Sequence, residues 1–186
     1  MPQKGPFLPG QLLLDSGSLS GSFFQRTVLL VCRHDAEGAF GLVLNRDTGT
    51  KAVDAIAAEL PATLQESPLF AGGPVQPTAL TYLLGNEAGA AGEILPGLTL
   101  GHSLDSLLEV GAGLPPGGRL KLFAGYSGWS PGQLEDEMRR KAWLTHPASL
   151  DLVFTPAPGD LWAAILKAKG GFHRLLAQMP EDPGRN

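Results

Sequence analysis

Two apolar runs between Thr27 and Arg46 constrain the fold of this chain more than any other feature. They read T-V-L-L-V-C-R-H and A-F-G-L-V-L-N-R, and the four residues D-A-E-G join them. Apolar, β-rich runs separated by a short segment that ends in Gly38 predict an antiparallel β-hairpin. Because both runs are almost continuously apolar, both faces of the hairpin are expected to be covered. The sequence therefore predicts a hairpin in the centre of a sheet.

Further elements surround this hairpin without a regular alternation of strand and helix. A helix is expected over residues 51–60, where apolar residues follow a helical spacing. Ser103 and Asp160 are expected to cap two more helices. Short strands are predicted at residues 12–15, 69–71, 79–84, 119–124 and 150–155. Helices that are few and do not alternate with strands favour an α+β fold over a doubly wound parallel sheet.

The length and composition of the chain fit one domain. The chain has 186 residues, of which 43% are hydrophobic and 17% are charged, so it can bury a substantial core. Only the last residues, P-E-D-P-G-R-N, are expected to form a frayed tail, from about residue 180. We therefore expect a single domain over residues 1–186.

The charge, cysteine and hydropathy patterns exclude several classes of function. The formal net charge is -4 and the fourteen Lys and Arg are scattered, so direct binding of nucleic acid is not expected. Cys32 is the only cysteine, which excludes an intrachain disulfide and favours a reducing compartment. No segment has the pattern of a signal peptide or of a membrane span. We expect a cytoplasmic protein that does not associate with a membrane.

The stretch over residues 122–134 raises the question of a catalytic serine. It reads L-F-A-G-Y-S-G-W-S-P-G-Q-L, so a strand, a Gly-x-Ser and a helix start follow one another as in many hydrolases. Trp129, however, stands where a nucleophile elbow has a glycine. The segment from Ser130 to Gln133 predicts a capping box, which would start the helix beyond Ser127. The stretch therefore favours a strand-to-helix connection over a nucleophile.

Other chemistries find less support in the sequence. Cys32 lies in the middle of an apolar strand, where a thiol usually packs and does not react. The four histidines show no spacing typical of a metal site, and no motif for nucleotide phosphates is present, so neither a metal nor a cofactor is expected. An enzyme remains the alternative, either a hydrolase that uses Ser127 with Asp160 and His173 or a thiol enzyme that uses Cys32.

Four stretches of the chain share the order and spacing of one known family. They are S-F-F-Q-R-T-V-L-L-V-C-R-H-D-A-E-G-A-F-G-L-V-L-N-R (22–46), F-A-G-G-P-V (70–75), G-Y-S-G-W-S-P-G-Q-L-E-D-E (125–137) and A-W-L-T-H-P-A (142–148). Together they resemble the YqgE/AlgH family, an uncharacterised bacterial group. The resemblance implies an α+β fold whose bent, mainly antiparallel sheet forms a pseudo-barrel with a few helices packed outside. It implies no reaction.

The resemblance also bears on regulation. The family's name derives partly from a genetic link to alginate production, and its members often carry the label of transcriptional regulator. This chain has neither a helix-turn-helix pattern nor a basic recognition surface, so its residues do not support direct DNA binding. It also departs from the family's pattern at residues 15–22, which read D-S-G-S-L-S-G-S, and at Asp47, where proline is usual.

The candidate binding residues lie at the hairpin ends and in the connections beyond it. Antiparallel pairing places Arg26 and the pair Asn45 and Arg46 at the same sheet edge, where they could meet on an anion or a backbone segment. The structural alternatives are an ion pair for Arg26 and a turn cap for Asn45. The other candidates, each also open to a packing or capping role, are Gly72, Gly73, Tyr126, Trp129 and Gln133.

We interpret the chain as a binding or interaction module that contributes indirectly to regulation. It is expected to hold a protein partner or a small ligand near Arg26, Asn45 and the loop 125–133. An enzyme is the first alternative, and a direct transcriptional regulator is the second.

Overall fold

The computed structural model describes residues 7–181, which form nine strands and seven α-helices. The strands are β1 (Gln11–Asp15), β2 (Val28–Asp35), β3 (Gly38–Val43), β4 (Asp47–Lys51), β5 (Pro68–Ala71), β6 (Val75–Gly85), β7 (Leu98–Gly101), β8 (Arg119–Trp129) and β9 (Trp143–Pro147). The helices are α1 (Ala52–Ala55), α2 (Ala62–Gln65), α3 (Leu104–Gly113), α4 (Gln133–Arg139), α5 (Leu150–Val153), α6 (Leu161–Lys169) and α7 (Gly171–Gln178), and a 3-10 turn (Pro158–Asp160) precedes α6. Most of the predicted tail lies outside the described residues.

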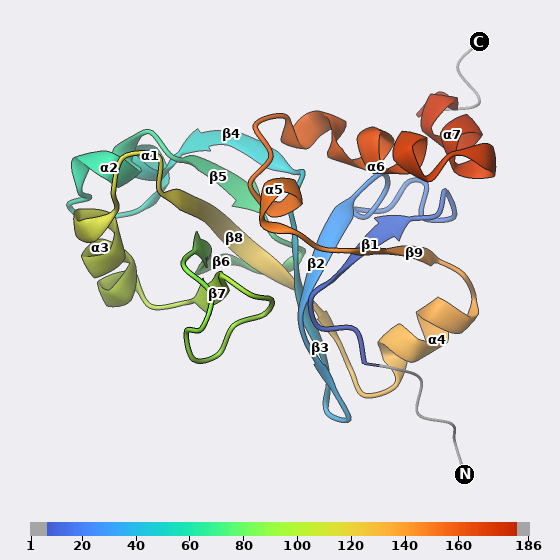
Figure 1. Ribbon diagram of the computed structural model, residues 1–186, viewed down its shortest axis with the longest axis horizontal. Helices are drawn as coiled ribbons and strands as arrows, with labels where there is room; N and C mark the ends of the chain where they lie inside the picture. Colours follow the sequence, from blue (N-terminus) through green and yellow to red (C-terminus); the bar gives the residue numbers. More distant parts are fainter. Residues whose placement is uncertain (1–6, 182–186) are drawn as a thin grey trace.

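All the strands belong to one sheet, which is mainly antiparallel. Its main path runs β4-β5-β8-β3-β2-β1-β9, and β6 pairs with both β8 and β7. Only β5 and β8 pair in parallel among the described strands. Because the path has separate ends at β4 and β9, the sheet is not closed into a barrel. The predicted α+β fold, with a mainly antiparallel sheet and helices outside it, is confirmed (Figure 1).

The central hairpin is formed by β2 and β3, as the two apolar runs predicted. Leu29 faces Val43, and Asp35 faces Gly38 next to the turn. The strand β1 flanks β2, and β8 flanks β3, so neither strand of the hairpin is at an edge. The hairpin therefore occupies the middle of the sheet.

The long strand β8 joins the two halves of the molecule (Figure 1). Its first part pairs with β5 and β6, for example through Leu122, and its last part pairs with β3, where Ser127 faces Gly41. Between these parts, Gly125 has a φ of 71°, in the left-handed region that favours glycine. The change of partner along β8 thus coincides with a residue that permits a bend.

Three apolar clusters fill the space between the sheet and the helices. One lies between the hairpin and α6, and includes Leu30, Leu42 and Trp162. A second covers the opposite face of the hairpin with residues around α4, and a third joins β5, β6 and β8 to the helices α1 to α3. The expectation that both faces of the hairpin are covered is therefore confirmed.

The helix predicted over residues 51–60 is wrong in extent. Only Ala52–Ala55 are helical, and the next residue, Ile56, has an extended backbone. Lys51 pairs within the sheet as the last residue of β4 and provides no side-chain cap. Val53, which the spacing placed in a buried stripe, is exposed. Pairing of β4 with β5 therefore outweighs the local helical pattern.

The predicted helix start at Ser130 is also displaced. The residue before α4 is Gly132, with a φ of 78°, and the amide of Gln133 closes a turn by donating to the carbonyl oxygen of Ser130 at 3.0 Å. The side-chain oxygen of Gln133 still accepts from the backbone N–H of Ser130 at 3.1 Å. One bond of the predicted capping box is thus present, but it stabilises the turn before the helix.

The C-terminal third contains a third correction. Residues 150–155, predicted as a strand, begin with the helix α5, because the Ser149 hydroxyl caps it by accepting from the Leu152 N–H at 3.3 Å. The predicted cap at Ser103 is confirmed, since its side chain accepts from the Ser106 N–H, whereas Asp160 precedes α6 without a side-chain capping hydrogen bond. The strands β4, β7 and β9 were not predicted.

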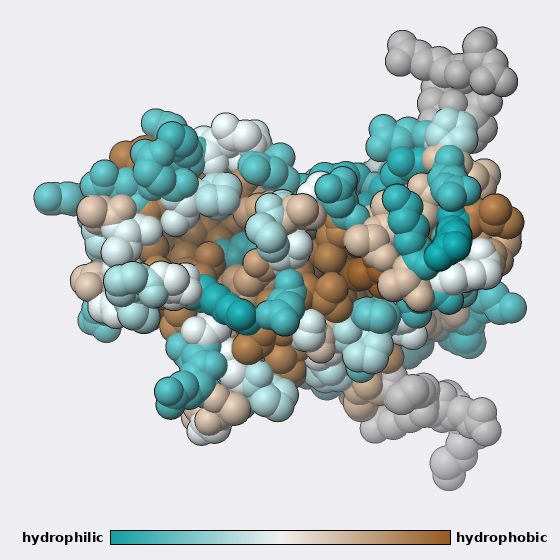
Figure 2. All heavy atoms as spheres, turned by 45° about the horizontal axis from the view of Figure 1, so that its top comes forward, coloured by the Kyte–Doolittle hydropathy of each residue, from teal (hydrophilic) through white to brown (hydrophobic). Residues whose placement is uncertain are grey.

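The surface is uneven in its distribution of apolar side chains. Figure 2 shows apolar side chains gathered in a hollow across the middle of one face, with hydrophilic side chains around it. Among the described helices, none is long and apolar enough to cross a membrane.

Candidate functional site

Three of the predicted site residues meet at the open end of the hairpin. The side-chain oxygen of Asn45 accepts from the Val28 N–H at 2.8 Å, and its amide donates to the Arg26 carbonyl oxygen at 2.9 Å. Arg46 donates to the carbonyl oxygen of Gln25. Asn45 is buried and bridges the two strands, so its side chain stabilises the entry into the hairpin. Antiparallel pairing predicted this meeting.

The backbone of Arg26 is fixed by a buried carboxylate. Asp15, at the end of β1, accepts from the Arg26 N–H at 2.8 Å and from the N–H groups of Gly17 and Leu19 at 2.8 and 3.2 Å. Arg26 has a φ of 55°, which is uncommon outside glycine. The segment that departs from the family's pattern therefore forms a loop that Asp15 organises and that sets the direction of the Arg26 side chain.

The guanidinium of Arg26 reaches the C-terminal helices. It lies over the ring of Trp162, 5.1 Å from its centroid, and donates to the Met179 carbonyl oxygen. It also lies 3.5 Å from a carboxylate oxygen of Glu181, whose own side chain is 77% exposed. The Arg26 side chain keeps 25% exposure and borders a hollow of about 110 Å³. We name this arrangement the Arg26 corner: Asp15, Gln25, Arg26, Trp162, Met179 and Glu181.

An apolar stripe on α7 and the residue after it adjoins the Arg26 corner. Phe172, Leu175 and Met179 are 71%, 61% and 51% exposed, and their spacing of three and four residues places them on one face of a helix. Met179 belongs both to the stripe and to the corner. Leu176, on the adjoining flank of α7, is buried and anchors the helix to the core. The structure therefore presents a cation and an apolar surface side by side.

The glycine pair of the predicted site packs against backbone. A Cβ atom on Gly72 would lie 2.4 Å from the Gly125 carbonyl oxygen, and one on Gly73 would lie 2.1 Å from the carbonyl carbon of Tyr126. The Gly72 carbonyl oxygen accepts from the hydroxyl of Ser127 at 3.1 Å. Tyr126 packs on Phe40, with ring centroids 5.0 Å apart. These contacts leave no space for a side chain beside β8.

The remaining two candidates surround a carboxylate at the turn end of the hairpin. One oxygen of Glu137 accepts from the indole N–H groups of Trp129 and Trp143, at 2.9 and 2.8 Å. Gln133 donates to the other oxygen at 3.3 Å. Both tryptophans are buried, so Glu137 satisfies two buried donors and joins β8, α4 and β9.

Removal of the Glu137 carboxylate is expected to destabilise the protein strongly. Glu137→Ala leaves two buried indole donors without an acceptor, at a cost of about 2 to 4 kcal/mol in unfolding free energy. Glu137→Gln keeps an acceptor oxygen and serves as the matched control, with a loss below about 2 kcal/mol. Urea unfolding measures both values. Equal losses for the two variants would contradict this role of the carboxylate.

The predicted site residues therefore do not converge on one place. Trp129 pairs with Ala39 beside the hairpin turn, whereas Arg26 precedes β2 at the open end. Gly72, Gly73 and Tyr126 lie between these ends, at the bend of β8. Of the candidates, Arg26 alone combines partial exposure, a positive charge and a bordering hollow.

The two candidate nucleophiles lie in surroundings that do not activate them. Ser127 is buried, and its hydroxyl donates to a carbonyl oxygen; within residues 7–181 no hydrogen bond joins it to a histidine. Burial raises the pKa of the Cys32 thiol, which disfavours the reactive thiolate. A nucleophilic serine needs a base within reach, and a nucleophilic cysteine needs a lowered pKa. Neither condition is met in the described part of the chain.

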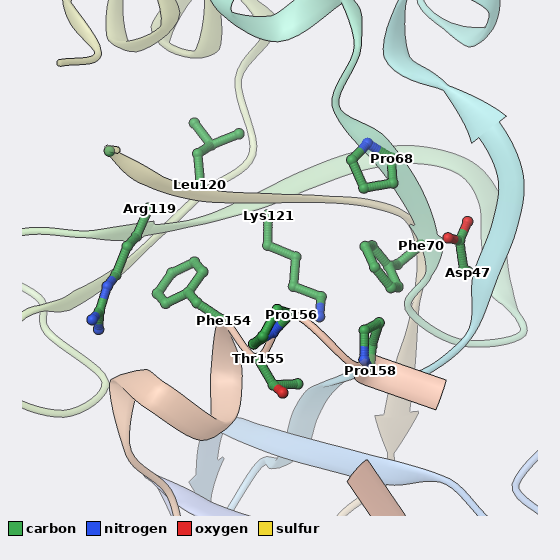
Figure 3. A pocket seen from close by; sticks show the side chains of 11 residues that line it. Asp47, Pro68, Phe70, Arg119, Leu120, Lys121, Phe154, Thr155, Pro156 and Pro158 are labelled. Atoms are coloured by element: carbon green, nitrogen blue, oxygen red, sulfur yellow. The ribbon is translucent and has the colours of Figure 1, made fainter. Parts of the chain in front are cut away.

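A larger pocket lies apart from all the predicted residues. It has a volume of about 410 Å³ and lies between β4, β5, the start of β8 and the segment that follows α5 (Figure 3). Lys121, on β8, is only 6% exposed and lines it. The sequence signal was a lysine between two leucines, Leu120 and Leu122, in a predicted strand. Sequence reasoning missed this site because a single lysine within a strand does not reveal a cavity around it.

The fold is that of an α+β protein with an open, mainly antiparallel sheet. Comparison of the chain with known proteins shows the family to which it belongs. A family model described as AlgH-like matches residues 12–174. A UPF0301 protein of Chlorobium limicola is 39% identical over 181 residues, with 96% of this chain and 95% of that protein covered. A UPF0301 protein of Rhodococcus opacus is 38% identical over 184 residues, with 96% and 90% covered. The chain therefore belongs to the AlgH-like family, as its four stretches predicted.

Two solved structures share the fold. The solution structure of the AlgH protein from Pseudomonas aeruginosa matches with a TM-score of 0.71 and 31% identity, over 97% of this chain and 99% of that one. A crystal structure of a protein from Corynebacterium diphtheriae matches with a TM-score of 0.77 and 22% identity, over 96% and 95% of the two chains. The second likeness concerns the fold alone.

Proposed function

We propose that this protein is a cytoplasmic binding module with an indirect role in regulation, and that it binds a protein partner at the Arg26 corner and the adjoining α7 stripe. The observation that carries this proposal is the exposure of Phe172, Leu175 and Met179 on one face beside a cation. Exposed apolar side chains gathered in this way typically mark an interaction surface. The single thiol, in Cys32, is consistent with a reducing compartment.

The charge of the corner indicates the chemistry of the partner. Glu181 is mostly exposed, so its ion pair with Arg26 contributes little to stability and can be exchanged. A carboxylate of a partner can take the same position over Arg26, while apolar side chains of that partner cover the α7 stripe. We therefore propose a partner segment that combines apolar residues with an acidic one.

We also infer that residues 1–186 act as one domain, because β8 pairs with strands in both halves of the sheet.

Charged residues in the α7 stripe are expected to abolish partner binding. The double variant F172D/L175D places two carboxylates on the proposed surface, and both positions are exposed, so the fold should tolerate them. Val53→Asp is the matched control, because Val53 is an exposed apolar residue on α1, away from the corner. The measurement is capture of partners from native lysate by each variant, together with photo-crosslinking from position 175 and from position 53.

The expected result is a crosslinked partner from position 175 only, which F172D/L175D fails to capture and which the Val53→Asp variant retains. Arg26→Ala should weaken capture less than the double variant does. Equal recovery of the same partner by the wild type and by F172D/L175D would exclude the stripe as the binding surface.

A further inference from the structure

The pocket that Lys121 lines has the size of a site for a small molecule. Its volume of about 410 Å³ lies near the lower end of the range for ligand sites, which suits a compound of about one ring. Figure 3 shows the Lys121 side chain extending from β8 into the pocket, with its amino group between Phe70 on one side and Pro156 on the other. The charged end of a buried lysine thus lies within the cavity.

The ammonium group of Lys121 is only partly satisfied by the protein. It donates to the Val153 carbonyl oxygen at 3.3 Å and lies 4.0 Å from the centroid of the Phe70 ring. No carboxylate of the described residues lies within 4.0 Å of it, although an ammonium has three N–H groups to donate. Burial lowers the pKa of Lys121 to about 8, while the charge of Asp47 acts in the opposite direction. A buried cation without a counter-ion in contact with it costs free energy. An anion that binds beside the ammonium offsets part of this cost and therefore binds more tightly.

The walls of the pocket are apolar and flat. They consist of the rings of Phe70 and Phe154 and of three prolines, Pro68, Pro156 and Pro158. Aromatic and proline rings offer planar surfaces against which another ring packs well. The body of the ligand is therefore expected to be a ring, with one polar group directed at Lys121.

Charges at the borders of the pocket restrict the anion. Asp47 lines one side of the pocket and repels additional negative charge. On another side, the Arg119 side chain extends away from the Lys121 amino group (Figure 3), and its guanidinium pairs with Asp151 at 3.1 Å. One available positive charge in an apolar cavity favours a singly charged carboxylate over a doubly charged and more strongly hydrated phosphate.

We propose that the Lys121 pocket is a binding site for a small aromatic monocarboxylate, whose carboxylate pairs with the Lys121 ammonium and whose ring packs between Phe70 and Phe154. This site is separate from the Arg26 corner, and no residue lines both. The proposal therefore stands independently of the partner surface on α7.

Benzoate is the probe that tests this proposal. Benzamide serves as its neutral counterpart and phenyl phosphate as its doubly charged counterpart. Titration of the full-length, isotope-labelled protein at pH 7 should give saturable NMR shift changes for benzoate at β5, β8 and residues 154–158. We expect benzoate to bind at least about ten times more tightly than benzamide, and phenyl phosphate to bind more weakly than benzoate. Benzoate affinity should fall as the pH rises from 7 to 10, because the Lys121 ammonium loses its proton.

Two variants complete the experiment. Lys121→Met keeps the length of the side chain and removes the charge, and it should weaken benzoate binding by at least about ten-fold. Lys51→Met is the matched control, since Lys51 is an exposed lysine paired with Glu66, and it should bind benzoate as the wild type does. Absence of saturable benzoate binding to the wild type, equal affinity for benzoate and benzamide, or shift changes centred on Trp162 would each overturn the proposal. These three readouts use the wild type, so they decide the matter even if Lys121→Met does not fold.

Discussion

Gly73→Ala is expected to abolish the native fold or to lower its unfolding free energy by more than about 4 kcal/mol. A single methyl group at this position would meet the backbone of β8, where the Tyr126 carbonyl carbon and oxygen and the Ser127 nitrogen lie 2.1, 2.2 and 2.4 Å from the added Cβ. Backbone atoms in the middle of a sheet cannot move aside without loss of strand pairing. Overpacking of this kind is much more costly than the loss of a surface contact.

Gly128→Ala is the control for this prediction. Gly128 also lies on β8, but a Cβ atom there has its nearest neighbour, a ring carbon of Tyr126, at 3.5 Å, which is an ordinary contact. Thermal and urea unfolding of both variants should therefore give a near-native protein for Gly128→Ala and a severely destabilised or insoluble one for Gly73→Ala. Native stability of Gly73→Ala would show that Gly73 does not pack against β8 as described.

The second large effect is a gain of stability when Lys121 is replaced. Burial lowers the pKa of Lys121 from 10.5 to about 8, so the folded protein holds this proton less tightly than the unfolded chain does. Below about pH 8 both states are protonated and the folded state carries the full cost of the buried charge, on the order of 3 kcal/mol. Lys121→Met removes this cost but also the contacts of the ammonium, so we expect a net gain of about 2 kcal/mol at pH 7.

The stability difference between the wild type and Lys121→Met is expected to change with pH in a definite direction. Between about pH 8 and 10.5 the unfolded chain binds more protons at Lys121 than the folded protein does, so wild-type stability should rise with pH relative to Lys121→Met. Urea unfolding of both proteins at pH 7 and at pH 10 measures the difference. The gain should shrink at pH 10, and a gain that is the same at both pH values would contradict a charge buried in the folded state. Lys51→Met, at an exposed position, should show little change.

The two predictions concerning Lys121 are linked. The same buried charge that weakens the fold is the group proposed to bind a carboxylate. A residue that lowers stability and improves binding is a common compromise at functional sites. Benzoate should accordingly stabilise the wild type and leave Lys121→Met unchanged.

The sequence predicted the hairpin well because its signal is local. Two continuous apolar runs and a short connection ending in Gly38 determine β2 and β3, and antiparallel pairing alone brings Arg26 next to Asn45. The lack of a regular alternation of helices and strands favoured the α+β class, the resemblance to the family implied the same class, and the structure confirms it. Elements whose existence depends on distant partners were harder to predict, as the short helix at Ala52–Ala55 after β4 shows.

The arrangement of the site could not be predicted, because it depends on register and on contacts between distant segments. Pairing of Ser127 with Gly41 places Trp129 at the turn end of the hairpin, far along the strand from Arg26, and nothing in the local sequence fixes that register. The pocket at Lys121 likewise requires residues 154–158 to cover β8. A lysine within an apolar strand was visible in the sequence, but the cavity around it was not.

The Arg26 corner joins segments that are far apart in the sequence, and this has a consequence for folding during synthesis. β1 pairs with both β2 and β9, and the carbonyl oxygen of Asp15 accepts from the indole N–H of Trp162, 147 residues later. A ribosome therefore releases the hairpin long before the residues that complete its neighbour have been made. Until then, β1 lacks its pairing with β9, and the Asp15 carbonyl oxygen lacks its hydrogen bond from Trp162. The nascent protein therefore reaches its native structure only after α6 has left the exit tunnel.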